Sequence, residues 1–80
     1  MNKTPYSAAK SIHLHVKNVP RDIRDAFTER AARALIWHGG DRVVQKANGD
    51  EWGSIVMRAK LDLRGHFDQD IIAQAVFEIS

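Results

Sequence analysis

Residues 11–36 read SIHLHVKNVPRDIRDAFTERAARALI, and the hydrophobic period of these residues changes at Pro20. Before the proline, apolar and polar residues alternate, which predicts a half-buried strand over 11–19. The apolar members would face the core, namely Ile12, Leu14 and Val16. The polar members would share the opposite face, namely His13, His15 and Lys17. Proline has no amide hydrogen for a strand ladder and suits the first turn of a helix, so the strand ends there.

An amphipathic helix follows from Arg21. Its apolar residues recur at spacings of three and four, which places on one stripe Ile23, Ala26, Phe27, Ala31, Ala34 and Leu35. Gly39 and Gly40 end the pattern, because glycine commonly follows the last turn of a helix. Trp37 stands in the last turn, and we expect it in the core.

The second half of the chain reads as two strands and a closing helix. Residues 42–47 are a short strand candidate, and Asn48 with Gly49 is a strong hairpin signal. Residues 54–63 alternate again, which predicts a further strand. Asp68 suits the N-cap of the closing helix. Residues 76–80 fit either the end of that helix or a short strand.

These patterns predict a single α+β domain over residues 11–80 with the order β-α-β-β-α. We expect a small two-layer domain in which a three-stranded antiparallel sheet carries two helices on one face. Residues 1–10 lack periodicity, so we expect a flexible N-terminal arm. A chain of 80 residues without cysteine has one modest core and no disulfides, so we also expect a homodimer to support the fold.

The composition excludes several classes of protein. Apolar residues make up 44% and charged residues 28% of the chain, which is typical of a folded domain. The absence of cysteine excludes thiolate metal sites. No apolar run approaches the ~20 residues that span a bilayer, and no signal-peptide pattern opens the chain. We therefore expect a cytoplasmic protein without membrane contact.

No arrangement of residues predicts catalysis. The serines lie in no nucleophile elbow, and no glycine-rich phosphate-binding loop follows a strand. His13 and His15 would leave the same face of a strand, but a metal site would need His38 or His66 to converge on them. The sequence therefore predicts a protein that is not an enzyme and holds no metal and no cofactor.

The charge is unevenly distributed, although the net charge is only +2. Residues 1–40 hold seven Lys and Arg residues against three acidic residues, whereas residues 41–80 hold five against seven. If the strands at 11–19 and 54–63 share a sheet, its exposed face collects His13, His15, Lys17, Arg58 and Lys60, with Trp52 beside them. A basic sheet with an aromatic residue suits single-stranded nucleic acid. The plain alternative is an ordinary solvated face.

We therefore expect a small nucleic-acid-binding regulator that uses this basic sheet face on DNA or RNA. Phosphate could instead dock at the start of the first helix, where Arg21 and Arg24 lie near free backbone amides. The alternative function is a protein-binding inhibitor or adaptor of the kind that phages and plasmids encode, docked on an acidic protein surface. Trp52 would then be the expected anchor, because large aromatic residues often anchor interfaces.

Residues 10–34, which include HLHVKNVPRDIRDAFTERAARA, resemble the strand-helix opening of ribbon-helix-helix DNA-binding proteins. In that family, too, a short alternating strand meets a proline and then an amphipathic helix. The resemblance implies that the strand pairs with its dimer mate. It also implies that His13, His15 and Lys17 point into the major groove of DNA.

Residues 14–20, LHVKNVP, resemble the first strand motif of RNA-recognition domains, in which an apolar-aromatic-apolar pattern precedes an asparagine. The order β-α-β-β-α is compatible with that fold. This resemblance implies RNA as the nucleic acid, and it places His15 or His13 at the aromatic position of the motif.

Overall fold

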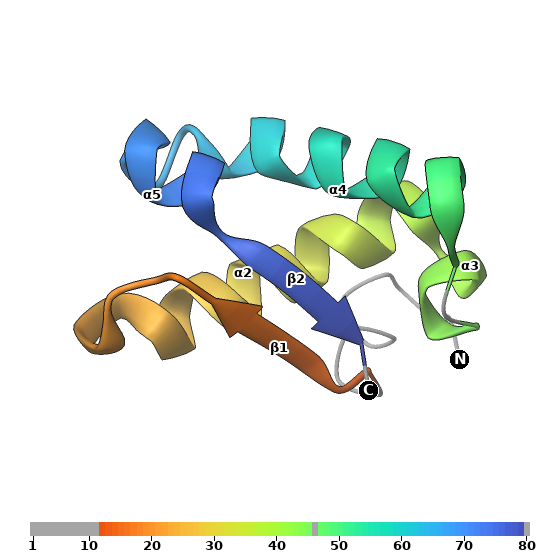
Figure 1. The fold of residues 1–80 in the computed structure, drawn as a ribbon, viewed down its shortest axis with the longest axis horizontal. Coiled ribbons are helices and arrows are strands. Elements are labelled where there is room, and N and C mark those ends of the chain that lie inside the picture. The colour runs from red at the N-terminus through yellow and green to blue at the C-terminus, as the bar shows by residue number, and fades with distance from the viewer. Residues whose placement is uncertain (1–11, 46, 80) are drawn as a thin grey trace, which may run out of the picture.

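Strands β1 (Leu14–Lys17) and β2 (Val76–Ile79) come from distant parts of the chain and pair antiparallel (Figure 1). The structure is a computed structural model, and it describes residues 12–45 and 47–79. Within these ranges, the sheet has two strands. The strand predicted over 11–19 is thus confirmed over its central part.

The register of the sheet gives it one buried and one exposed face. Val16 lies opposite Phe77, and both side chains are buried. His15 lies opposite Glu78 on the other face, and both are exposed. Because successive side chains alternate across a strand, the apolar face covers the helices and the polar face meets solvent.

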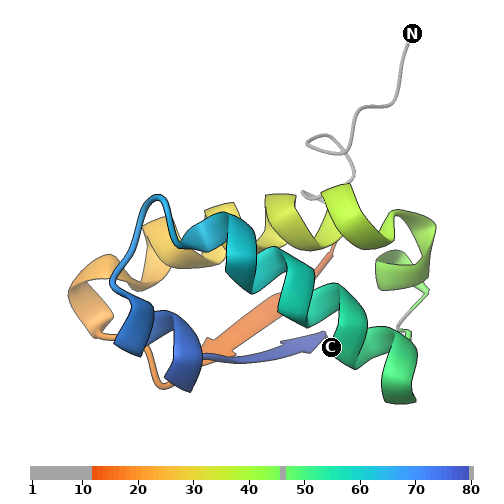
Figure 2. The ribbon, with the colours of Figure 1, turned by 90° about the horizontal axis from the view of Figure 1, so that it is seen from above.

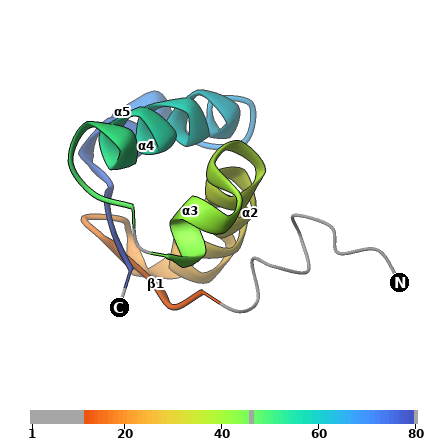
Figure 3. The ribbon, with the colours of Figure 1, turned by 90° about the vertical axis from the view of Figure 1, so that its right-hand side faces the viewer.

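Helices fill the chain between the two strands. In chain order they are the 3-10 turn η1 (Arg21–Ile23), α2 (Arg24–Gly39), α3 (Asp41–Val44), α4 (Gly49–Leu63) and α5 (Gln69–Gln74). Helices α2 and α4 lie side by side and run in opposite directions (Figure 2). Seen end-on, α2, α4 and the sheet surround one interior (Figure 3). The helix predicted from Arg21 to Gly39 is confirmed.

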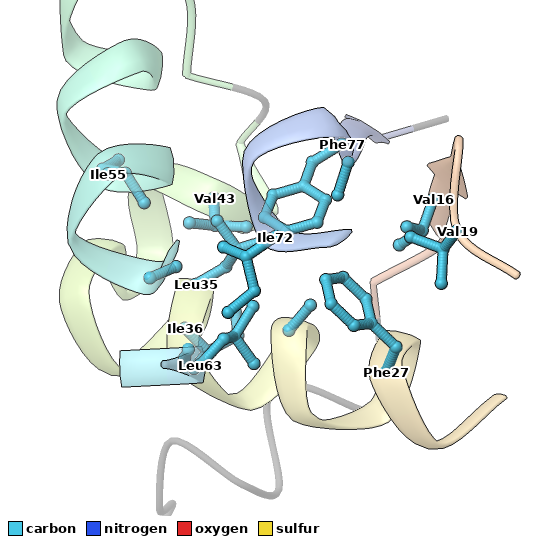
Figure 4. Packing of buried hydrophobic residues seen from close by; sticks show 14 residues of the cluster. Val16, Val19, Phe27, Leu35, Ile36, Val43, Ile55, Leu63, Ile72 and Phe77 are labelled. Atoms are coloured by element: carbon cyan, nitrogen blue, oxygen red, sulfur yellow. The ribbon is translucent and has the colours of Figure 1, made fainter. Parts of the chain in front are cut away.

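One hydrophobic core lies where α2, α4, α5 and the strands meet (Figure 4). Phe27 is fully buried, and its ring centroid lies 4.9 Å from that of Phe67 and 6.2 Å from that of Phe77. Aromatic rings at these separations attract each other beyond the effect of buried area. Ile55 on α4 is buried as well. The prediction that Phe27 and Ile55 are core residues is confirmed.

The strand predicted over 54–63 is wrong, because this stretch belongs to helix α4. The buried residues of α4 are spaced by four, namely Ile55, Ala59 and Leu63. A spacing of four fits an alternating strand and one face of a helix equally well. Met57 and Leu61 complete the strand pattern, yet both are exposed in the helix. The stretch is also rich in Ala, Leu, Met, Lys and Arg, which have the highest helix propensities.

The strand at 42–47 and the hairpin after it are also wrong. Asp41–Val44 forms the short helix α3. Asn48 is the extended N-cap residue of α4, and Gly49, with φ +57°, is the first residue of that helix. Asparagine is a common N-cap, and glycine tolerates a positive φ, so the pair suits a helix start as well as a hairpin turn.

The closing helix begins as predicted. The Oδ1 atom of Asp68 accepts a hydrogen bond from the backbone N–H of Asp70 at 2.8 Å, which caps α5. The helix ends at Gln74, and the chain continues directly into β2. Of the two alternatives for residues 76–80, the short strand is therefore confirmed over Val76–Ile79.

The chain is α+β as expected, but the predicted three-stranded sheet with two helices on one face is wrong. The described ranges contain a two-stranded sheet and four α-helices in the order β-α-α-α-α-β. The two stretches predicted as strands in the second half contain helices α3 and α4 instead, and β1 pairs with β2 at the far end of the chain. The arm predicted over 1–10 lies outside the described residues. Of the described helices, none has the length and apolar character needed to cross a bilayer.

The end of α2 packs closely against its neighbours at Gly39. A Cβ atom at this position would lie 2.5 Å from Val43 Cγ2 and 2.9 Å from Ile55 Cδ1, so the missing side chain lets α3 and α4 approach. Trp37, two residues earlier, is 62% exposed. The prediction that Trp37 is a core residue is wrong, because the last turns of α2 bury Leu35 instead.

Candidate functional site

The outer face of the sheet holds three of the predicted site residues. His15 and Lys17 are exposed on β1, and His13 is exposed just before it. Glu78 on β2 shares this face, and its Oε1 lies 3.1 Å from Lys17 Nζ. The carboxylate balances the lysine, so the charge of this face is small.

The structure does not bring the other three residues predicted for the sheet face to it, because Trp52, Arg58 and Lys60 lie on α4. Arg58 is exposed on this helix, whereas Trp52 is half-buried and packs against the core. Lys60 Nζ donates a hydrogen bond to the backbone oxygen of Ala75 at 2.8 Å and lies 5.7 Å from the centroid of the Phe77 ring. Burial lowers the pKa of Lys60.

The start of the first helix holds Arg21 and Arg24. Arg24 Nη2 donates a hydrogen bond to the backbone oxygen of Val19 at 3.1 Å, so this guanidinium is anchored to the loop. Asp22 and Asp25 lie in the first turns of η1 and α2. Carboxylates next to helix amides favour the helix but disfavour a second anion there.

The described surface is close to neutral overall. The whole chain has 12 Lys and Arg residues and 10 Asp and Glu residues. Three of the lysines, at positions 3, 10 and 46, lie outside the described residues. The described ranges therefore hold nine basic residues (12 minus 3) and ten acidic ones. Positive potential is local, and it depends on where acids are absent or already paired.

One face of α2 presents two arginines and a tryptophan. Arg30, Arg33 and Trp37 stand at i, i+3 and i+7, so they share one stripe of the helix. They border an open hollow of about 220 Å³ between α2 and the end of α4, which we call the α2 hollow. Its remaining walls are Ala34, Asp62, Leu63 and His66.

Two side-chain contacts join the walls of the α2 hollow. Arg30 Nη1 donates to His66 Nε2 at 3.2 Å. Because a guanidinium has no acceptor, the imidazole is the acceptor in this hydrogen bond, through Nε2. His38 Nε2 lies 2.7 Å from Asp62 Oδ2. The acid in the hollow therefore already has a partner.

Arg33 has a partner along the helix. Its Nη2 lies 2.7 Å from Glu29 Oε1, and both side chains are largely exposed. Exposed pairs at this spacing contribute only about 0.3–0.5 kcal/mol. Breaking the pair between Arg33 and Glu29 in order to bind a phosphate would therefore cost little free energy.

The stripe on α2 can be read from the sequence, because the spacing of its three residues follows the helix that Pro20 starts. Assigning Trp37 to the core hides this signal. The opposite wall has no such signal in the sequence. His66 and Asp62 approach α2 only because residues 49–63 form a helix rather than a strand.

The four histidines lie at two separate places in the fold. In residues 12–45 and 47–79, no three His, Asp or Glu side chains gather where they could share a metal ion. His13 and His15 lie at the sheet, while His38 and His66 bond to residues of the α2 hollow. A cationic helix face with an exposed indole can bind anionic and planar groups.

No family model, curated protein or solved structure matches this chain. The resemblances to ribbon-helix-helix proteins and to RNA-recognition domains therefore stay predictions.

Proposed function

We propose that this chain is a non-catalytic protein that binds single-stranded nucleic acid at the α2 hollow. The observation that carries the proposal is the exposure of Trp37, 62% of whose surface meets solvent next to Arg30 and Arg33 on the same helix face. The exposed indole can stack on a planar base, and the two guanidinium groups beside it can bind an anionic phosphate. These are the two parts of a nucleotide.

The energies of these contacts suit a single-stranded nucleic acid that lies across the surface. Stacking of a base on an aromatic side chain contributes about 1–3 kcal/mol. Arg30 and Arg33 add phosphate contacts that release counterions, which makes the affinity fall with salt. A base paired within a duplex does not expose its face to Trp37, so single strands are favoured.

The size of the α2 hollow supports binding rather than catalysis. Pockets that enclose whole small ligands measure roughly 300–1,000 Å³. The α2 hollow, at about 220 Å³, is smaller and open. It accommodates contact with part of a strand, and the bulk of the ligand would stay in solvent.

Anisotropy of fluorescein-labelled single strands, about 15 nucleotides long, tests the proposal. We expect Arg30→Glu and Arg33→Glu each to weaken binding of DNA or RNA strands about tenfold. The slope of log affinity against log salt should fall by about 0.7 for each phosphate that the variant no longer neutralises. Matched controls are Lys17→Glu on the sheet face and Arg21→Glu at the start of the first helix, which should change affinity less than about threefold.

Two outcomes would contradict the α2 hollow as the site. If the two control variants weaken binding more than Arg30→Glu and Arg33→Glu, the oligonucleotide binds at the sheet face or at the start of the first helix. If no variant changes binding and the affinity does not depend on salt, the protein is not a nucleic-acid binder. The protein-binding alternative would then stand alone.

A further inference from the structure

The outer face of α4 carries two large apolar side chains. Met57 and Leu61 are 67% and 51% exposed, and they lie four residues apart on the face opposite the buried Ala59 and Leu63. Single apolar residues are common on protein surfaces and need no explanation. These two, however, line the same groove.

This groove, of about 200 Å³, lies between α4 and α5, and we call it the α4–α5 groove. The α4 wall consists of Met57, Lys60, Leu61 and Arg64. The α5 wall consists of Gln69, Ile72 and Ala73. Most of the lining is apolar, and it includes two cations but no carboxylate. The charge of the groove therefore has one sign, although the described surface as a whole is balanced.

The two cations of the groove have different surroundings. Lys60 is fixed in the wall by its hydrogen bond to the backbone oxygen of Ala75. The side chain of Arg64 makes no hydrogen bond or ion pair with any residue in 12–45 or 47–79. Its guanidinium can therefore take a carboxylate through two parallel hydrogen bonds without first breaking a contact.

We propose that the α4–α5 groove docks an acidic amphipathic helix of another protein. Apolar side chains of that helix, spaced by three and four residues, would cover Met57 and Leu61. A flanking carboxylate would pair with Arg64. This surface lies on the side of α4 away from the α2 hollow, and the inference does not depend on nucleic-acid binding.

Charge decides against a second copy of this chain as the occupant. In a two-fold dimer through this face, the same surface patch of each copy meets that of the other. The cationic rim of one copy, Lys60 and Arg64, would then face the rim of the other. Like charges opposed in an interface cost free energy, whereas an acidic helix gains from the same rim.

Two designed peptides with one apolar face test the proposal. Both are about 18 residues long, with leucines spaced by three and four, and the flanking positions hold Glu in one and Lys in the other. Anisotropy should show that the Glu peptide binds at least about tenfold more tightly than the Lys peptide. Leu61→Gln and Arg64→Glu should each weaken the Glu peptide about tenfold. Val44→Gln, which changes an exposed apolar residue on α3, is the matched control and should leave binding unchanged.

Circular dichroism verifies that each variant is folded. Binding of the labelled single strand is measured separately, so failure of this site is distinguishable from failure of the α2 hollow. The proposal is overturned if the Glu peptide shows no binding below about 100 μM, or if the Lys peptide binds as tightly. It is also overturned if the wild-type chain sediments as a dimer that Leu61→Gln converts to monomer, because a second copy then occupies the groove.

Discussion

Arg30 Nη1 lies 3.2 Å from Nε2 of His66, although the two residues are 36 positions apart in the chain. The contact joins α2 to the turn that follows α4. It holds the guanidinium of Arg30 at the wall of the α2 hollow, next to Trp37. Both partners are exposed, so the bond orients a side chain more than it stabilises the fold.

We expect His66→Ala to loosen Arg30 without unfolding the protein. Binding of a labelled single strand should weaken about two- to fivefold, because an arginine that is no longer held loses more rotamer freedom on binding. Urea unfolding should change by less than about 0.5 kcal/mol, as for other surface substitutions. His15→Ala on the sheet face is the control. An equal effect of the two variants would show that the hydrogen bond does not position Arg30.

Phe27→Ala should destabilise the protein by about 3–5 kcal/mol, enough to unfold a domain of this size. The ring is fully buried next to Phe67 and Phe77. Its removal therefore leaves a cavity between α2 and β2. Chemical denaturation monitored by circular dichroism measures the loss. Met57→Ala, at an exposed position, should change stability by less than about 1 kcal/mol. A similarly small change for Phe27→Ala would mean that the core is not packed around this ring.

Two glycines on helices predict opposite outcomes for the same substitution. Gly39→Ala places a Cβ atom against Val43 and Ile55, so we expect a loss of about 1–3 kcal/mol. Gly53 lies inside α4, and a Cβ atom added there would meet nothing within 4 Å, so Gly53→Ala should stabilise the protein by about 0.5–1 kcal/mol. Thermal unfolding of the two variants checks both signs. If residues 49–63 were a strand, Gly53→Ala would not gain helix propensity.

Lys60 predicts a pH dependence of stability. Burial lowers its pKa in the folded protein below 10.5, so folding disfavours the charged form. This penalty is present below the folded pKa and disappears as the pH rises through the folded and then the unfolded pKa. The free energy of unfolding of wild type minus that of Lys60→Met should therefore increase between about pH 8 and pH 11. A decrease over this range would mean that contacts to backbone carbonyls raise the pKa of Lys60 instead.

The sequence is sufficient to predict the strand and the first helix, because a single proline separates a stretch with the period of a strand from one with the period of a helix. Ile12, Leu14 and Val16 alternate before it, and the helical stripe begins after it. It is insufficient for α4. Ile55, Ala59 and Leu63 satisfy both periods. Among the apolar positions, Trp52 and Val56, at helical spacing, favour the helix, whereas Met57 and Leu61 complete the strand pattern.

The candidate site shows the same limit. The stripe of Arg30, Arg33 and Trp37 depends only on local helical spacing, so it can be read from the sequence. The position of His66 depends on the packing of α4 against α2, and the α4–α5 groove depends on the packing of α5 against α4. These are tertiary relations, which no local pattern contains.

Fluorescence of Trp37 alone reports whether a nucleic acid contacts the α2 hollow. The chain has two tryptophans, so Trp52→Phe leaves Trp37 as the only one. Titration of this variant with single-stranded oligodeoxythymidylate should quench the indole emission, because a stacked base contacts the exposed ring, and added salt should reverse the quenching. The matched variant Trp37→Phe retains the half-buried Trp52 and should show little quenching. Emission from Trp37 that stays unchanged while the strand binds, or quenching that is equal in the two variants, would contradict binding at the α2 hollow.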